Sequence, residues 1–199
     1  MFKSNIENNE VTKLPRIVFE GNSVVISSAE ELNKQLAIFT NESIVGFDTE
    51  SKPSFKKGIS NGIALLQLAT SNKSLLIRIK ETGITNSLVK LLEDPNTIKV
   101  GAAIRDDLKG LFKIRKFTPK AFIDLQNVAQ KFDIESVSVR KLAAIVLQGR
   151  VSKRQQLSNW EANPFTEQQI EYAATDAWVC KKILEVFCNA DPNIIKTNK

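Results

Sequence analysis

Two acidic side chains close a short apolar segment, and their spacing is the first sign of chemistry in this sequence. Asp48 and Glu50 stand in the run IVGFDTES. Residues i and i+2 of a β-strand point to the same face, so both carboxylates should leave the strand end side by side. Like charges this close raise a pKa unless a cation or a hydrogen-bond donor lies between them. The pair is therefore a candidate functional site, and a solvated strand end entering the loop SKPSFKKG is the alternative.

Asp176 is predicted to lie in a long helix that starts after Thr166, where TEQQ has the spacing of a capping box. At about 100° per residue, it falls within the apolar stripe formed by Ala173, Cys180, Ile183, Leu184 and Phe187. A carboxylate in such a stripe is costly unless it is paired, hydrogen-bonded or bound to a metal. Tyr172 lies one turn earlier, so its hydroxyl can approach whatever Asp176 binds. The alternative is a buried structural carboxylate that holds a backbone amide or an arginine.

A third acidic position lies in the run KVGAAIRDDLKGLF, where two aspartates are adjacent. The buried face of the expected helix is formed by Ile104, Leu108, Leu111 and Phe112. Asp107 lies beside that face, whereas Asp106 points away from it. We therefore expect Asp107 to face inward and Asp106 to be a first-turn residue favoured by the helix dipole. Without the other motifs, two ordinary acidic residues near a helix start would explain the pair equally well.

The composition restricts the chemistry, because the 199 residues include no histidine. This excludes Ser-His-Asp and Cys-His nucleophiles, most catalytic zinc sites and a histidine general base. The only cysteines, Cys180 and Cys188, are too few for a four-cysteine zinc site. Eight residues apart on one rigid helix they cannot form a disulfide with each other, which is typical of a reduced, intracellular protein.

The formal net charge of +6 suits a polyanionic partner. Five basic and no acidic residues lie in segment 109–120, and three more basic residues lie in segment 150–154. For either segment alone, a solvated basic face is the alternative. No apolar run approaches the roughly 20 residues of a membrane span, and the polar N-terminus has no signal-peptide pattern, so we expect a cytoplasmic protein without membrane contact.

The hydrophobic pattern predicts one domain over residues 15–190, with a flexible tail at residues 1–14 and another at residues 191–199. Strands are expected at 16–26, 43–48, 63–69, 74–79, 97–101 and 120–124. Helices are expected at 28–39, 85–93, 103–113, 125–132, 137–147 and 167–188. Early strands joined by short turns, followed by alternating strands and helices, indicate an α/β domain with a mixed five- or six-stranded sheet flanked by helices.

Taken in order, the motifs FDTE, VGAAIRDDLKGL and YAATD resemble the three exonuclease motifs of the DnaQ-like DEDD superfamily. The Tyr-x-x-x-Asp spacing of the third motif marks the tyrosine subgroup, since the other subgroup has a histidine there. The chain is similar to ribonuclease D and to Werner-helicase-type exonuclease domains over roughly residues 40–188. The runs IALLQLAT and SVSVRKLAAIVLQGRVSKRQQLSNWEANPFTEQQIEYAATD extend the likeness. The resemblance implies a ribonuclease H-like fold and a 3′–5′ exonuclease.

The resemblance also implies roles for the acidic residues. Asp48, Glu50 and Asp176 would hold one divalent cation, and Asp48 would bridge to a second. Asp107 would support the second ion, through water, and the hard oxygen ligands suit Mg²⁺ or Mn²⁺. Two ions roughly 3.5–4 Å apart can stabilise the attacking and leaving oxygens of an in-line displacement. Tyr172 would orient the attacking water, and the products would be nucleoside 5′-monophosphates.

The expected partner is the 3′ end of DNA or RNA, and several side chains are candidates to contact it. Basic residues could bind phosphates, and aromatic residues could stack on a terminal base or line the groove. These candidates are Lys52, Phe55, Lys56, Lys57, Arg150, Lys153, Arg154 and Trp160. For Phe55 and Trp160, hydrophobic packing is an equal alternative. Two other functions remain open: a nucleic-acid-binding module of the same fold without catalysis, and an endonuclease of the ribonuclease H-like superfold.

Overall fold

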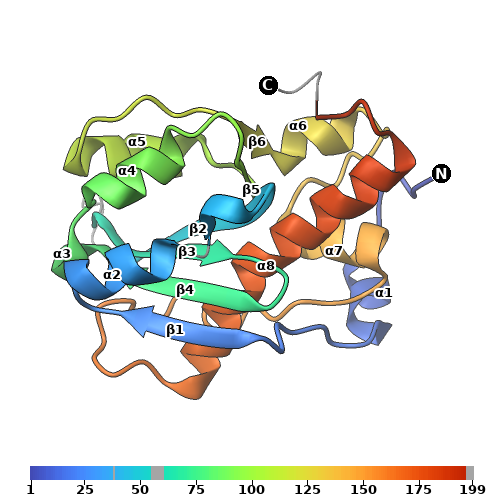
Figure 1. The fold of residues 1–199 in the computed structure, drawn as a ribbon. Helices are drawn as coiled ribbons and strands as arrows, with labels where there is room; N and C mark the ends of the chain where they lie inside the picture. Colours follow the sequence, from blue (N-terminus) through green and yellow to red (C-terminus); the bar gives the residue numbers. More distant parts are fainter. Residues whose placement is uncertain (38, 55–60, 196–199) are drawn as a thin grey trace.

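A six-stranded mixed sheet forms the centre of the protein, and β2 (Ile44–Ser51), which carries the first two candidate carboxylates, lies inside it (Figure 1). The computed structural model describes residues 1–37, 39–54 and 61–195. The other strands are β1 (Asn22–Ile26), β3 (Ile63–Ala69), β4 (Lys73–Arg78), β5 (Ile98–Gly101) and β6 (Phe122–Asp124). The strand order is β1-β4-β3-β2-β5-β6, in which only the pairs β2–β3 and β3–β4 are antiparallel. The prediction of a mixed α/β sheet is therefore confirmed.

Helices cover both faces of this sheet. They are α1 (Asn8–Lys13), α2 (Ala29–Leu36), α3 (Ile79–Thr82), α4 (Asn86–Leu92), α5 (Arg105–Ile114), α6 (Leu125–Gln130), α7 (Val139–Leu147) and α8 (Glu167–Ala190), with a short 3-10 helix at Phe39–Asn41. On β2, Val45 and Phe47 pack into a core with α2, α4 and α5, whereas Gly46 between them faces α8. The strand alternation thus turns Asp48 and Glu50 toward α8.

Local sequence signals explain where α8 begins. The Thr166 side chain accepts a hydrogen bond from the backbone N–H of Gln169, and the Gln169 side chain accepts one from the backbone N–H of Thr166. This is the predicted capping box, and it satisfies two backbone groups that a helix start leaves unpaired. Cys180 and Cys188 both lie in α8 as free thiols, so they do not pair with each other. No helix in the described ranges is long and apolar enough to cross a membrane.

The terminal segments differ from the predicted tails. Within residues 1–14, α1 forms, and Val11 and Ile6 are buried in the core beside α7 and α8. The Ser4 carbonyl also accepts a hydrogen bond from the backbone N–H of Glu135. At the other end, Ile194 is buried in the same core, so residues 191–195 pack on the domain as well. A few apolar side chains therefore anchor these described parts of the predicted tails, although the segments are otherwise polar.

Two element boundaries also differ in ways that matter for the site. β2 continues to Ser51, because Glu50 still pairs with Leu65 of β3 before a bulge breaks the register. Asp48 and Glu50 therefore lie inside a strand, which fixes both backbones, and not at its free end. The predicted strand 74–79 ends at Arg78, where the short helix α3 begins.

Candidate active site

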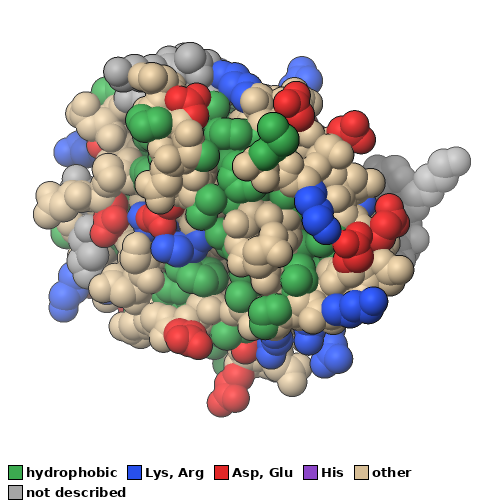
Figure 2. Space-filling model, turned by 90° about the vertical axis from the view of Figure 1, so that its right-hand side faces the viewer, with side chains coloured by type: hydrophobic (Ala, Val, Ile, Leu, Met, Phe, Trp, Pro, Cys, Tyr) green, Lys and Arg blue, Asp and Glu red, His purple; other side chains and the backbone are tan. Residues whose placement is uncertain are grey.

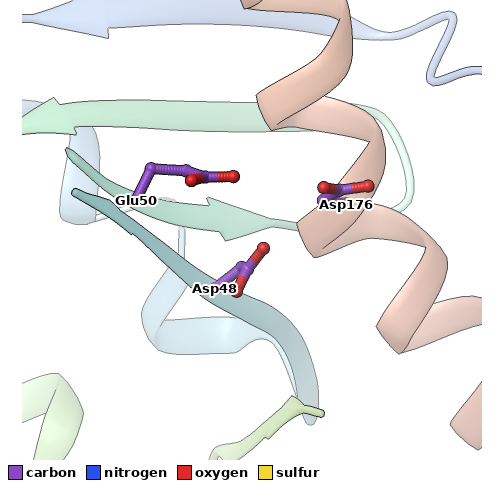
Figure 3. A group of neighbouring side chains, drawn as sticks. All are labelled: Asp48, Glu50 and Asp176. Carbon is purple, nitrogen blue, oxygen red and sulfur yellow. The ribbon is translucent and has the colours of Figure 1, made fainter. Parts of the chain in front are cut away.

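Three carboxylates from two elements meet over the middle of the sheet. Asp48 and Glu50 extend from β2 and Asp176 from α8, and one oxygen of each lies within 4.8 Å of the others. Figure 3 shows the three carboxyl groups facing the same space between the strand and the helix. The i, i+2 spacing on β2 and the inward phase of Asp176 on α8 are the causes, as the sequence predicts. This arrangement offers hard oxygen ligands to a divalent cation.

The close approach of α8 to β2 depends on small residues. A Cβ atom added at Gly46 would lie 1.9 Å from the carbonyl oxygen of Ala177, so only glycine fits at this point of the strand. On the helix side, Ala173, Ala174 and Ala177 are fully buried. Because Gly46 is two residues before Asp48 and Ala177 follows Asp176, this contact sets the distance between the two aspartates.

Asp107 approaches the same site from α5. It accepts a hydrogen bond from the hydroxyl of Thr49, the residue between Asp48 and Glu50 in the sequence. Its neighbour Asp106 is 88% exposed and pairs with Lys109 at 2.8 Å. The prediction that Asp107 faces inward and Asp106 outward is confirmed.

Asp124, which the sequence reasoning did not single out, holds the start of α5 in place. Its carboxylate accepts hydrogen bonds from the backbone N–H groups of Ala103 at 3.1 Å and Ile104 at 3.2 Å. It also caps α6 by accepting from the N–H of Gln126 at 2.9 Å. Asp124 thus links the end of β6 to the helix that carries Asp107. The adjacent Leu125 and the expected helix at 125–132 made Asp124 a candidate N-cap in the sequence.

Burial and mutual repulsion disturb the titration of these acids. Burial raises the pKa of Asp48 well above its usual range, and the charges of Asp176 and Glu50 add to the shift. Burial raises the pKa of Glu50 to about 8 and that of Asp176 to about 7. Burial likewise raises the pKa of Asp107. Among the described residues, no lysine or arginine forms an ion pair with any of the four, so an external cation is the natural source of neutralising charge.

Tyr172 lies one turn before Asp176 and is 8% exposed. Its hydroxyl acts on Asp176 as a hydrogen-bond donor, which lowers the pKa of that carboxyl against the effect of burial. Burial, followed by the charge of Asp176, raises the pKa of Tyr172 above its ordinary value. The phenol therefore stays neutral at physiological pH, so it can donate a hydrogen bond but is a poor general base.

The carboxylates open into a cavity of about 310 Å³ that also contains basic side chains. Lys153, predicted to contact substrate, lies on its wall, and so does Arg140 at the start of α7. Arg154 lines a neighbouring cavity of about 240 Å³, and Tyr172 borders both. Arg140 was missed because helical phase alone does not show which distant element a helix start faces. On the face drawn in Figure 2, basic and acidic side chains are interspersed, so the positive charge there forms no single patch.

The other predicted substrate contacts have varied positions. Lys52 pairs with Glu161 at 3.3 Å on the surface. Arg150 donates from Nε to the carbonyl of Leu14 at 3.0 Å, and Trp160 is only 1% exposed. The burial of Trp160 fits the packing alternative, whereas Arg150 is half-buried and its contact with substrate stays a prediction. Phe55, Lys56 and Lys57 lie outside the described residues and stay predictions.

The sequence of this chain is similar to those of known proteins. The sequence model of a family described as 3′-5′ exonuclease matches residues 23–189. A 3′-5′ exonuclease of Arabidopsis thaliana is 35% identical over 153 residues, which are 71% of this chain and 52% of the plant protein. Ribonuclease D of Gluconacetobacter diazotrophicus is 30% identical over 77% of this chain and 39% of its own length. The mouse bifunctional 3′-5′ exonuclease/ATP-dependent helicase WRN is 32% identical over 88% of this chain and 13% of its own length. The chain thus spans about half the length of these relatives, or less.

Solved structures share the fold. The EXO domain of Aedes aegypti Nibbler superposes with a TM-score of 0.78 at 25% identity, covering 89% of this chain and 95% of that domain. Ribonuclease D of Escherichia coli superposes with a TM-score of 0.73 at 21% identity, covering 88% of this chain and 48% of that protein. These neighbours confirm the ribonuclease H-like fold. By the family match over residues 23–189, the chain belongs to the 3′–5′ exonuclease family with a DnaQ-like domain, as ribonuclease D and the WRN exonuclease domain do.

Proposed function

We propose that this chain is a metal-dependent exonuclease that shortens DNA or RNA from the 3′ end and releases nucleoside 5′-monophosphates. The group formed by Asp48, Glu50 and Asp176 carries the proposal, because these acids lie within 4.8 Å of one another. Burial raises the pKa of each of them. Such a cluster opposes folding unless it serves a cation. A module that only binds nucleic acid would gain nothing from acidic groups facing phosphates, which argues against the silent alternative.

The donor set fits Mg²⁺ or Mn²⁺, which prefer carboxylate oxygens. Asp48, Glu50 and Asp176 would hold one ion, and Asp48 would also reach a second ion that Asp107 supports through water. Bound there, two divalent ions supply the charge that stabilises the attacking and leaving oxygens of an in-line displacement. The Thr49 hydroxyl keeps one Asp107 oxygen occupied, which fixes the orientation of that carboxylate.

The remaining groups orient the reactants. Tyr172 would hydrogen-bond the attacking water beside Asp176, and its neutral phenol would hold that water in line with the scissile bond. Lys153 and Arg140, on the wall of the same cavity, would contact backbone phosphates of the bound strand. Arg154 in the adjoining cavity and the surface residue Lys52 are further candidate phosphate contacts.

The test uses single- and double-stranded DNA and RNA labelled at the 5′ end, incubated with protein and either Mg²⁺ or Mn²⁺. A ladder that shortens from the 3′ end, with mononucleotide 5′-phosphates among the products, is expected. The variant Asp176→Asn should lose nearly all activity while it keeps its circular dichroism spectrum. Asp106→Asn is the matched control, because this aspartate of the second motif is exposed and points away from the site. No degradation of any of these substrates would contradict the proposal.

The role of Tyr172 is tested separately. Tyr172→Phe removes the hydroxyl and leaves the buried ring, so kcat should fall while the affinity for Mn²⁺, measured by calorimetry, stays unchanged. A loss of Mn²⁺ affinity in this variant would contradict a purely positioning role.

A further inference from the structure

Arg78, at the end of β4, is a buried cation with a specific set of partners. It is 4% exposed. Its Nη1 and Nη2 atoms both donate to the carbonyl oxygen of Ala162 at 2.7 Å, and its Nε donates to Glu81 at 2.7 Å. A charged side chain is rarely buried this far without a structural reason. Here the guanidinium joins the sheet to segment 159–165, which precedes α8.

A row of aromatic rings leads from this guanidinium to Tyr172. The guanidinium lies over the ring of Phe165, 4.5 Å from its centroid. Phe165 meets Trp160 edge-on at 5.9 Å between ring centroids, and Trp160 packs on Tyr172 at 5.9 Å. Trp160 is almost fully buried, so each ring in the row limits the position of the next.

The strand register places this row beside the carboxylates. Glu50 of β2 is paired with Leu65 of β3, and Leu65 is paired with Arg78 of β4. Directly paired residues point to the same face of a sheet, so Glu50 and Arg78 share the face that α8 covers. Leu65 between them packs in one cluster with Trp160 and Tyr172.

We propose that Arg78 is a positioning residue for Tyr172, acting through segment 159–165. The inference rests on the proposed function, in which the Tyr172 hydroxyl orients the attacking water beside Asp176. Arg78 would hold the phenol in the position that this role requires. The double hydrogen bond to Ala162 fixes the segment, and the segment fixes the ring of Trp160 against Tyr172. Glu161 of this segment also pairs with Lys52 and Lys80, but both pairs are exposed and such pairs contribute little.

The first experiment is a double-mutant cycle on kcat. Arg78→Lys keeps the charge but loses the planar double donor and the stacking on Phe165. It should lower kcat by about tenfold with KM changed less than twofold, and by no more than Tyr172→Phe does. In the Tyr172→Phe background the same substitution should have almost no further effect, because the hydroxyl it positions is gone. Equal losses in both backgrounds, or no loss in either, would overturn the proposal.

Two further variants keep the test informative. Lys80→Met is the matched control, because it removes an exposed ion pair of the same segment and should leave kcat unchanged. Phe165→Leu removes the ring beneath the guanidinium with a small change in volume. It should lower kcat in the unmodified protein and have almost no further effect in the Tyr172→Phe background, so it can replace Arg78→Lys if that variant does not fold. Additive losses in Phe165→Leu would count against the row of contacts.

The second experiment does not depend on activity. The chain contains a single tyrosine, so protein labelled with ring-¹³C tyrosine gives the signals of Tyr172 alone. Arg78→Lys should shift or broaden these signals, and Lys80→Met should leave them in place. Unchanged signals in Arg78→Lys would overturn the proposal even if the protein degrades nucleic acid. Shifted signals in a protein without nuclease activity would support the positioning contact while the proposed function fails.

Discussion

The contact between Gly46 and α8 allows a sharp test of how closely the site depends on helix position. In Gly46→Ala, the new Cβ atom would meet the Ala177 carbonyl oxygen at 1.9 Å, whereas ordinary contact begins at 3.4 Å. The helix or the strand must therefore move by about 1.5 Å, since neither partner is a flexible side chain. That movement separates Asp176 from Asp48, because Asp176 directly precedes Ala177 and Asp48 lies two positions after Gly46.

The magnitude follows from this displacement. A misplacement of about 1 Å in an active site costs about 100-fold in rate, so kcat of Gly46→Ala should fall at least that far. Over-packing of a core typically costs about 1–3 kcal/mol, so the free energy of unfolding should fall by a similar amount and the domain should still fold. Steady-state hydrolysis of a labelled oligonucleotide gives kcat, urea unfolding gives the stability, and calorimetry gives the affinity for Mn²⁺, which should weaken.

Gly62→Ala is the matched control, because a Cβ atom at Gly62 would have no heavy atom of the described residues within 4 Å. It should behave as the unmodified protein in all three measurements. If Gly46→Ala keeps its kcat and its Mn²⁺ affinity, the distance between strand and helix does not set the geometry of the acidic group, and this reasoning is refuted.

Three further predictions follow from the site and the core. With a chelator present, the melting temperature should fall as pH rises from about 5 to 8.5. The reason is that the folded protein retains protons on Asp176 (pKa about 7) and Glu50 (pKa about 8), whereas the unfolded chain releases them near pH 4. Asp176→Asn should flatten this slope, and a melting temperature that rises with pH would contradict the raised pKa values. Mn²⁺ at 100 times its Kd should stabilise the fold by about 2.7 kcal/mol in thermal melts at pH 8. Asp48→Asn should remove this effect. Equal stabilisation of both proteins would mean that the ion binds elsewhere. Val11→Ala should lower the free energy of unfolding, measured in urea, by about 2 kcal/mol. Thr12→Ala changes an exposed residue and should lower it by less than about 0.5 kcal/mol. Equal small effects would mean that α1 does not belong to the core.

The parts of the site that the sequence predicted are those set by local periodicity. Alternation along a strand places Asp48 and Glu50 on one face, and the angular step of a helix distinguishes Asp107 from Asp106. The capping box at Thr166 fixes the start of α8 and thereby the phase of Asp176. Each of these inferences needs only neighbours within a few positions, where the backbone geometry is known in advance.

The parts that escaped prediction depend on contacts between distant segments. The partner of Arg78 is 84 positions away at Ala162, and nothing near either residue indicates the other. Trp160 was ambiguous between base stacking and packing, and only its burial beside Tyr172 decides for packing. The N-terminal segment reads as polar because its buried residues, such as Val11, have no regular period.

The route of the chain through the site has a consequence for its biosynthesis. A ribosome delivers β2 with Asp48 and Glu50 early, but Asp176 belongs to the last long helix of the described chain. Because the three-carboxylate group closes only when α8 packs against β2, a chain still lacking this helix has no complete site for a cation. Under the proposed function, an emerging polypeptide cannot cleave nucleic acid until almost the whole domain has been made.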